Sequence, residues 1–516
     1  MRPIYATPGR RVAGPHRSGR SADERGRTGP RGRDTAWFAR AGAGVQNGRP
    51  MAHESLDTHE KTTQINRDES RYGTFAEIGA GQEVARWFFR VGGAAGTVAK
   101  TISAYDMQVS DAIYGGAQRY VSRNRLQTML DYEFRLLLER LDGKRGDTTG
   151  FFVFADTVAA TSWSRKGDPN GWVGIRFQHV PRAEPSEIII HVRMLDRENL
   201  QQQEALGIMG VNLLWGAFHL ANRPTDLIRS LLDDLTRDRV EVDMVRCDGP
   251  AFADVDNRLL ALELVRNDLA HAVMFRADGE TVQASEVLYQ RPVLIERGRF
   301  RPVTRVTHDM LEKALAQFVR SDDVAHADVA VLMEMTLRNL TAGAAIDTQD
   351  FLDRVDLLGA LGRGVLISNY FEYYRLAAYL YRYTHSRIGI VMGVPSLREV
   401  FVEKYYTHLD GGILEAFGRM FKSDLRLYVY PFLDPETGTL VTAEDFEVAP
   451  NLRHLYAHLV QNGFIEPVRD FDRAALPIRS RDVLARLRAG DPAWAEMVPG
   501  EVAQRIRERR LFGFRG

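Results

Sequence analysis

The apolar and polar positions of residues 51–516 predict a first half of mixed periodicity and a more regular second half. From residue 75 to 142 apolar positions recur mostly at helical spacing, as in VARWFFRV and RLQTMLDYEFRLLLERL, which predicts mainly helix. The period then shortens, and three strands are predicted at residues 151–160, 171–180 and 187–195. Further helices are predicted at 199–220, 224–238 and 257–270, with strands at 240–245 and 271–275.

The second half alternates short apolar segments with helical patterns. The segments are DVAVLMEMTL, GVLISN, RIGIVMG and LRLYVYPFL. Such alternation is typical of right-handed βαβ units, so we expect an α/β fold with a doubly wound, Rossmann-like parallel sheet from about residue 325. The preceding segment RPVLIERGRFRPVTRV carries many charges and prolines, and we expect a loop or an edge strand there.

These patterns suggest four regions. Residues 1–60 form an Arg/Gly-rich extension that we expect to be disordered, and residues 61–150 form a helical segment. Residues 151–324 form a mixed α+β domain, and residues 325–516 form the doubly wound domain with a helical tail.

The neutral total charge hides a basic beginning. Residues 1–50 hold eleven arginines, no lysine and three acidic residues, a balance of +8, which leaves −8 for residues 51–516. All-arginine, Gly/Pro-rich composition favours an over-extended start before Met51, with a phosphate-seeking arm or a targeting segment as the alternatives. No apolar run suits a membrane span or a secretory signal. We therefore expect a cytoplasmic protein without a membrane or a specific nucleic acid as partner.

Two loops follow predicted parallel strands. Ligands of open α/β sheets bind beyond the carboxyl ends of the strands, which selects Ser368, Asn369 and Tyr370 after one strand and Gly393 after the next. Ordinary turns and helix caps are the alternative for both loops.

The segment EIGAGQE places Gly79 and Gly81 at the start of a helix. It resembles a phosphate loop weakly, because the third glycine and a P-loop lysine are absent. Glu77 and Glu83 flank the glycines and would repel a phosphate unless a metal intervened. Close helix packing explains the glycines equally well.

Two polar clusters are further candidates. Gln201 and Gln202, followed by Glu204, can read a base or amide edge, or they are a solvated helix start. Arg299 and Arg301, with Arg297 upstream, can bind a phosphate or carboxylate bidentately, or they are surface charge. The histidines show no zinc-ligand spacing, and Cys247 is the only cysteine, which excludes an intramolecular disulfide.

A resemblance covers residues 60–462 or so. The runs ESRYGTFAEIGAGQEVARWFF, MLDRENLQQQEALGIMGVNL, FLDRVDLLGALG and LDGGILEAFGRMF resemble a widespread bacterial family. Its members are often labelled nicotinamide or nicotinate mononucleotide adenylyltransferase, and sometimes TonB-dependent receptor. The first label implies a nucleotidyltransferase of NAD biosynthesis that uses ATP with Mg²⁺. The HxGH signature of that superfamily is absent from this chain.

Two hypotheses about function follow. One is a nucleotide-handling enzyme with Arg299, Arg301 and Glu204 as catalytic residues and a small-molecule nucleotide as ligand. The other is a non-enzymatic ligand-sensing or scaffolding protein. The enzyme hypothesis predicts that Glu77, Gln202, Glu204, Arg301 and Asn369 converge on one cleft, whereas scattered positions favour the other. A homo-oligomer stays open.

Overall fold

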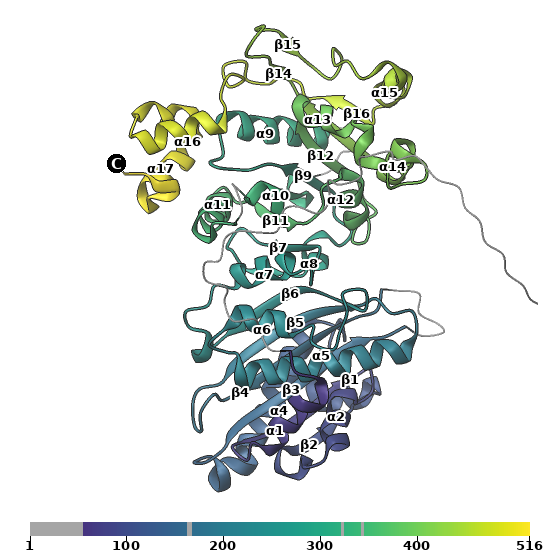
Figure 1. The fold of residues 1–516 in the computed structure, drawn as a ribbon, viewed down its shortest axis with the longest axis vertical. Coiled ribbons are helices and arrows are strands. Elements are labelled where there is room, and N and C mark those ends of the chain that lie inside the picture. Colours follow the sequence, from purple (N-terminus) through teal and green to yellow (C-terminus); the bar gives the residue numbers. More distant parts are fainter. Residues whose placement is uncertain (1–54, 162–167, 321–324, 342–344, 516) are drawn as a thin grey trace, which may run out of the picture. The chain divides into compact units, whose positions relative to one another are not determined.

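The computed structural model describes residues 55–161, 168–320, 325–341 and 345–515. Within these ranges the chain builds two large β-sheets with helices packed on their faces (Figure 1). Residues 1–54, which hold Met51 and most of the expected extension, lie outside the described residues, so the predictions about them stay untested. Residues 58–60, the end of the expected extension, belong to the helix α1 (Thr58–Arg67). None of the helices in the described ranges is long and apolar enough to cross a bilayer.

The first sheet has six strands in the order β2-β1-β3-β4-β5-β6. β1 pairs in parallel with β2 and β3, and the remaining neighbours are antiparallel. The strands are β1 (Arg71–Ile78), β2 (Val98–Ile102), β3 (Gly150–Ala159), β4 (Asn170–Phe177), β5 (Ser186–Met194) and β6 (Val240–Asp248). The helices of this part are α1 (Thr58–Arg67), α2 (Glu83–Val91), α3 (Met107–Tyr114), α4 (Arg123–Arg145), α5 (Asn199–His219), α6 (Pro224–Ser230) and α7 (Asn257–Arg266).

Both faces of this sheet are covered. Phe151 and Val153 of β3 pack with α4, whereas Phe152 and Phe154 face the core that contains α2 and α5. Every residue of β3 is buried, which explains why its sequence is largely apolar instead of alternating, with Asp156 and Thr157 as its polar residues. The strands predicted near β3, β4, β5 and β6 and the long helix α5 are confirmed.

The prediction of mainly helix over 75–142 was wrong for two stretches. β1 runs through Phe75 to Ile78, and β2 replaces the end of the expected helix. Gly73 of β1 lies so close to β3 that a Cβ there would sit 2.4 Å from the carbonyl oxygen of Phe152. Pairing with β3 decides the conformation of this segment, and a single-sequence pattern carries no information on such pairing.

The second sheet has eight strands in the order β16-β13-β12-β9-β10-β11-β7-β8. The strands from β16 to β11 are mutually parallel, and β7 and β8 add antiparallel strands beyond β11. The strands are β7 (Ala272–Phe275), β8 (Thr281–Val282), β9 (Val293–Arg297), β10 (Ala330–Thr336), β11 (Gly364–Ser368), β12 (Ile388–Gly393), β13 (Leu425–Tyr430) and β16 (Ile465–Pro467).

The order of the parallel strands is that of a doubly wound nucleotide-binding fold. Numbered along the chain, they lie 6-5-4-1-2-3, so the strand order reverses between β9 and β12. α9 and α11 contribute to one hydrophobic core, and α12, α13 and α14 contribute to the other. The predicted Rossmann-like α/β fold is confirmed.

Between β10 and β13 helices alternate with the strands, as the sequence pattern predicts. The helices around this sheet are α8 (Ala284–Leu288), α9 (Arg305–Arg320), α10 (Leu337–Leu340), α11 (Thr348–Ala360), α12 (Tyr373–Leu380), α13 (Val394–Val400), α14 (Gly412–Met420), α15 (Arg453–Gln461), α16 (Ser480–Ala489) and α17 (Gly500–Arg509), and a small hairpin joins β14 (Phe432–Leu433) to β15 (Leu440–Val441).

The interpretation of residues 291–306 as a loop or edge was wrong. Val293–Arg297 is β9, which lies between β12 and β10 as the first parallel strand. The prolines at 292 and 302 lie outside the strand, and its charged residues Glu296 and Arg297 stand at its carboxyl end. The parallel sheet thus takes its first strand from before residue 325, while the division into domains stays a prediction.

Candidate functional site

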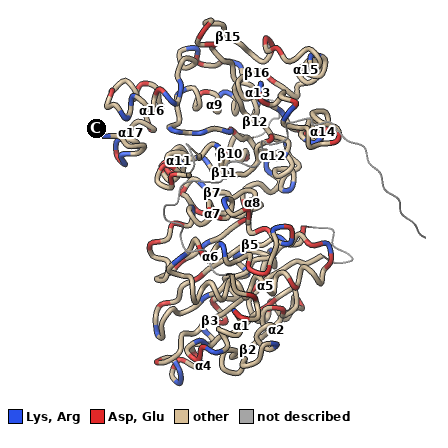
Figure 2. The backbone as a smooth tube through the Cα atoms, in the orientation of Figure 1, with Lys and Arg blue, Asp and Glu red and all other residues tan. Residues whose placement is uncertain are grey.

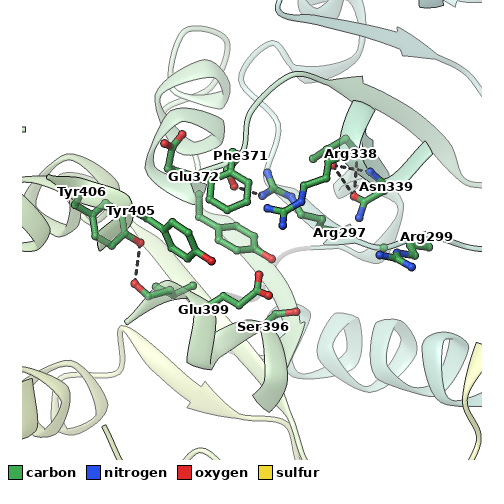
Figure 3. Close-up of a pocket in the computed structure, with 14 residues that line it drawn as sticks. Arg297, Arg299, Arg338, Asn339, Phe371, Glu372, Ser396, Glu399, Tyr405 and Tyr406 are labelled. Atoms are coloured by element: carbon green, nitrogen blue, oxygen red, sulfur yellow. Dashed lines mark hydrogen bonds between the residues drawn. The ribbon is translucent and has the colours of Figure 1, made fainter. Parts of the chain in front are cut away.

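A cavity of about 330 Å³ lies at the carboxyl ends of β9, β10, β11 and β12 (Figure 3). This is the place where the strand order reverses, and open α/β sheets bind ligands there. Basic and acidic positions are interspersed along the described chain (Figure 2), so the charge of this cavity is a local feature. The cavity is lined by Arg297, Gly298, Arg299, Thr336, Arg338, Asn339, Phe371, Glu372, Tyr373, Ser396, Glu399, Val400, Tyr405 and Tyr406.

Two exposed arginines supply positive charge to the cavity. Arg299 follows β9, and Arg338 lies in α10 directly after β10. Neither forms an ion pair with a carboxylate of the described residues. The Arg338 guanidinium lies 4.9 Å from the centre of the Phe371 ring, and Figure 3 shows Arg299 apart from it. Both cations are therefore available to an anionic ligand.

A third arginine, Arg297, is held by a buried carboxylate at the base of the cavity. Its Nε and Nη2 donate to the two carboxylate oxygens of Glu334 at 2.8 and 3.0 Å, and its Nη1 donates to the carbonyl of Phe371 at 2.8 Å. Glu334 is fully buried and also accepts a hydrogen bond from Ser368 Oγ at 2.6 Å. A buried carboxylate needs such partners, and the pair fixes the orientation of the guanidinium.

The charge of Arg297 is maintained despite its surroundings. Burial lowers its pKa, but Glu334 and the nearby Tyr373 and Glu372 more than offset that effect, so the pKa of Arg297 is raised. The guanidinium carbon lies 4.2 Å from the centre of the Tyr373 ring. Arg297 is thus a fixed cation stacked on an aromatic face.

The opposite wall offers hydroxyl groups and a carboxylate. Burial raises the pKa of Tyr373, while Arg297 and a hydrogen bond with Ser396 act in the opposite direction without cancelling it. The phenol is therefore protonated and able to donate. Glu399 of α13 is exposed at the cavity. Tyr405 packs edge-on against Phe371, with 4.9 Å between the two ring centres. The cavity thus combines cations, aromatic faces and a hydrogen-bond acceptor.

Among the residues predicted from sequence, Arg299 lines this cavity and Ser368 supports it through Glu334. Gly393 is the residue that precedes α13 and makes no side-chain cap. Tyr370 is buried, and its hydroxyl has no hydrogen-bond partner in the described part of the chain. Burial raises the pKa of Tyr370.

Arg301 and Asn369 have partners outside the cavity. Arg301 Nε donates to Asp350, and Asn369 Nδ2 donates to Asp268 at 3.2 Å. Neither is among the residues that line the cavity. The loop rule selected the correct edge of the sheet, but not each residue on it.

The glycines of the first sheet serve the backbone. Gly79 has φ of 103°, and a Cβ there would lie 1.9 Å from the carbonyl oxygen of Val158. The carboxylate of Glu77 accepts from the backbone amides of Val84 and Ala85 at 2.9 and 3.0 Å. The Glu77 carboxylate thus takes the place at the start of α2 that a phosphate has in a phosphate loop, and Gly81 has φ of 79° beside it.

The residues of the glutamine cluster have different surroundings and do not form one site. Gln202 is buried and donates to Thr161 Oγ1 and to the carbonyl of Asp196, both at 2.8 Å. Gln201 is exposed, and its backbone carbonyl accepts a hydrogen bond from Arg239 Nη2 at 2.8 Å. Glu204 lines a separate cavity of about 180 Å³ together with residues of α2.

The five residues proposed to converge therefore do not line one cavity within the described ranges. Sequence reasoning missed Arg338, Asn339, Tyr373, Glu399 and Tyr405. Arg338 and Asn339 could have been found at the end of the segment DVAVLMEMTLRN. The rule that ligands bind beyond the carboxyl ends of parallel strands selected Ser368 after β11, and it applies equally to the neighbouring β10. In the described ranges no three His, Cys, Asp or Glu residues are placed to hold a metal ion.

Comparisons with known proteins add little to this geometry. No protein-family model and no curated protein matches the chain. The chain is similar to competence/damage-inducible protein CihA from Agrobacterium tumefaciens, at 17% identity over 31% of this chain and 97% of that chain, with a TM-score of 0.23. It is also similar to competence damage-inducible protein A from Klebsiella pneumoniae, at 16% identity over 32% of this chain and 99% of that chain, with a TM-score of 0.25.

A competence-damaged protein (CinA) superfamily protein from Klebsiella pneumoniae 700603 is similar at 16% identity, over 32% of this chain and 98% of that chain, with a TM-score of 0.24. At such TM-scores these likenesses carry no argument about function. Membership of the family labelled as adenylyltransferases stays a prediction, and the assignment of a function depends on the cavity itself.

Proposed function

We propose that this protein binds an anionic ligand of the nucleotide class in the cavity at the carboxyl ends of β9 to β12. The observation that carries the proposal is the presence of Arg297, Arg299 and Arg338 on one cavity beside Phe371 and Tyr373. The cavity's position supports it, because doubly wound sheets bind nucleotides where the strand order reverses.

The two kinds of wall suit the two parts of a nucleotide. Phosphate oxygens would accept from Arg299 and Arg338, which have no carboxylate partner among the described residues. The rings of Phe371, Tyr373 and Tyr405 offer apolar faces for a base or sugar. The exposed Glu399 would accept from a ribose hydroxyl.

The enzymatic form of the proposal is adenylyl transfer to a nicotinamide-type mononucleotide. A phosphate oxygen of the mononucleotide would form a bond to the α-phosphorus of ATP, the bond between the α-phosphorus and the bridging oxygen would break, and pyrophosphate would leave. Arginines at the cavity would stabilise the charge on the transferring group, the role that the absent HxGH motif has elsewhere. Mg²⁺ would arrive with the nucleotide, and Glu372 and Glu399 are the carboxylates of this cavity that would meet it.

A second candidate is a sensor that binds the same ligand without turnover. The observation in its favour is that Glu77, Gln202, Arg301 and Asn369 have structural partners of their own instead of lining the cavity. Release of pyrophosphate from ATP and the mononucleotide separates the two candidates. Turnover that depends on Arg299 and Arg338 supports the enzyme, and binding without turnover supports the sensor.

The binding proposal is tested by thermal unfolding of the full chain with ATP, the mononucleotide, NAD, pyrophosphate or inorganic phosphate, each with and without Mg²⁺. A ligand at one hundred times its Kd stabilises the fold by about 2.7 kcal/mol. We expect stabilisation by ATP or pyrophosphate that is lost in the Arg299→Gln/Arg338→Gln double variant. The control is Arg320→Gln, which changes an arginine that is 67% exposed outside the cavity. The absence of stabilisation by every one of these ligands would refute the proposal.

A further inference from the structure

A buried arginine of α11 joins the two short segments that carry the exposed arginines of the cavity: residues 298–301 after β9, and residues 337–341 after β10, which include the single-turn helix α10 (together, the two loops). The side chain of Arg354 is 1% exposed. Its Nη1 donates to the backbone carbonyl of Arg299 at 3.1 Å and to that of Asn339 at 3.0 Å. The first carbonyl belongs to the loop after β9, and the second belongs to α10 next to Arg338.

Asp350 holds the Arg354 side chain in place through an ion pair. One carboxylate oxygen of Asp350 pairs with Nη2 of Arg354, and the other pairs with Nε of Arg301. Arg301 is itself in the loop after β9, and its carbonyl accepts from Ser480 Oγ at 2.8 Å. The carboxylate therefore ties the same loop to α11 a second time.

The residue type suits this arrangement. A guanidinium presents donors in a rigid plane, so one side chain can hold a carboxylate and two carbonyls at fixed angles. A buried group with these partners is expensive to replace, because each carbonyl would lose its donor away from water. Nothing in the packing of α11 alone requires donors at this position, since Phe351, Val355 and Leu358 provide its apolar contacts.

We propose that Arg354 is a positioning residue that sets the separation of Arg299 and Arg338 and thereby favours ligands with two linked phosphate groups over a single phosphate. The proposal rests on the proposed function, because it assumes that the cavity binds an anion. Two cations on separate loops reach neighbouring phosphate groups together only if the loops hold one distance. Asp350 acts through Arg354 and touches no ligand.

The test compares Arg354→Met with Arg363→Met in the full chain. Both substitutions remove a guanidinium of low exposure, but Arg363 donates to Glu312 and to neither carbonyl. Amide hydrogen exchange is measured at residues 298–301 and 338–341, and the Kd values for pyrophosphate and inorganic phosphate are measured by calorimetry. Exchange reports local opening without any ligand.

In Arg354→Met we expect faster exchange in both loops and pyrophosphate affinity weaker by about tenfold or more. The Kd of inorganic phosphate divided by the Kd of pyrophosphate should fall by about threefold or more, because phosphate needs one loop only. Arg363→Met should leave loop exchange and the ratio unchanged. If Arg354→Met fails to fold, Asp350→Asn takes its place. It should change loop exchange and the Kd ratio in the same direction but by a smaller factor.

The possible failures are distinguishable. If Arg354→Met speeds exchange in both loops but the protein binds neither anion, Arg354 still holds the two loops together. The proposed function and the preference for pyrophosphate over phosphate would then be refuted. An unchanged ratio of Kd values with weaker binding of both anions would overturn the positioning role. Unchanged exchange in the two loops would overturn it as well.

Discussion

Replacement of Glu334 by glutamine should destabilise the protein strongly, because it leaves the Arg297 guanidinium charged and without its counter-ion. Glu334 is fully buried and accepts from Arg297 Nε and Nη2 and from Ser368 Oγ. The amide keeps the oxygen that can accept from Ser368, but it turns an NH₂ group toward a guanidinium. Removal of one partner of a buried ion pair costs about 3–5 kcal/mol.

Glu312→Gln makes the same chemical change at an ion pair whose carboxylate is partly exposed. Glu312 is 37% exposed and pairs with Arg363, so its replacement should cost about 1 kcal/mol or less. Urea unfolding of both variants and the wild type, followed by tryptophan fluorescence, gives the loss of free energy from the shift in midpoint. If the two variants lose equal stability within about 0.5 kcal/mol, Arg297 does not depend on a buried counter-ion, and the explanation of the cavity's fixed cation is wrong.

Two further predictions concern the first sheet. Burial raises the pKa of Glu77 to about 7, with the amides of Val84 and Ala85 acting in the opposite direction. A raised carboxyl pKa makes the folded state hold its proton, so the contribution of Glu77 to stability should be greatest below about pH 4.5 and fall toward pH 7 by up to about 1.4 kcal/mol per pH unit. Urea midpoints across this range should show that loss in the wild type, and the loss should be smaller in Glu77→Gln; parallel curves would contradict it. Gly73→Ala should cost about 1–3 kcal/mol, because the new methyl group would overlap the carbonyl of Phe152. Gly418→Ala in α14, where a Cβ would meet nothing within 4 Å, should stabilise by about 0.5–1 kcal/mol; equal destabilisation by both changes would refute the close approach of β1 and β3.

Local pattern was sufficient for elements that bury one or both faces in a regular way. The run FFVFADTVAA predicted β3 because a strand that is buried on both faces is mostly apolar. The segments that end at Ser368 and Gly393 predicted β11 and β12. Their alternation with helices also predicted the parallel sheet. These inferences use only residues close together in the chain.

The missed elements depend on distant partners. β9 is a five-residue strand that ends in Glu296 and Arg297, and these charges are tolerated because Glu334 meets the arginine from the neighbouring strand. Glu296 is buried, and burial raises its pKa well above the usual value, so it can be neutral inside the fold. A sequence alone does not say which charges will be paired or neutral, and charge content therefore argued against a strand.

For the candidate site, too, local pattern located the region, and contacts with distant partners decided which residues belong to it. The rule for carboxyl ends of strands led to the correct edge of the sheet, with Ser368 and Gly393 on it. Glu77 was selected for its glycine neighbours, but its carboxylate takes the amides at the start of α2. The same rule would have led to Arg338, which directly follows β10, whereas Tyr373 lies in α12 and joins the cavity only after β10 and β11 pair in register.

Photolabelling with 8-azido-ATP, followed by peptide mapping of the full chain, tests the location of the ligand most directly. The proposed function predicts that the label falls on residues around Phe371, Tyr373 or Tyr405 and that excess ATP or pyrophosphate prevents it. Arg299→Gln/Arg338→Gln should abolish the labelling that ATP prevents, and Arg320→Gln should preserve it. Labelling that ATP prevents but that maps to the separate cavity around Trp87 and Glu204, or that survives in the double variant, would contradict the assignment of this cavity as the nucleotide site.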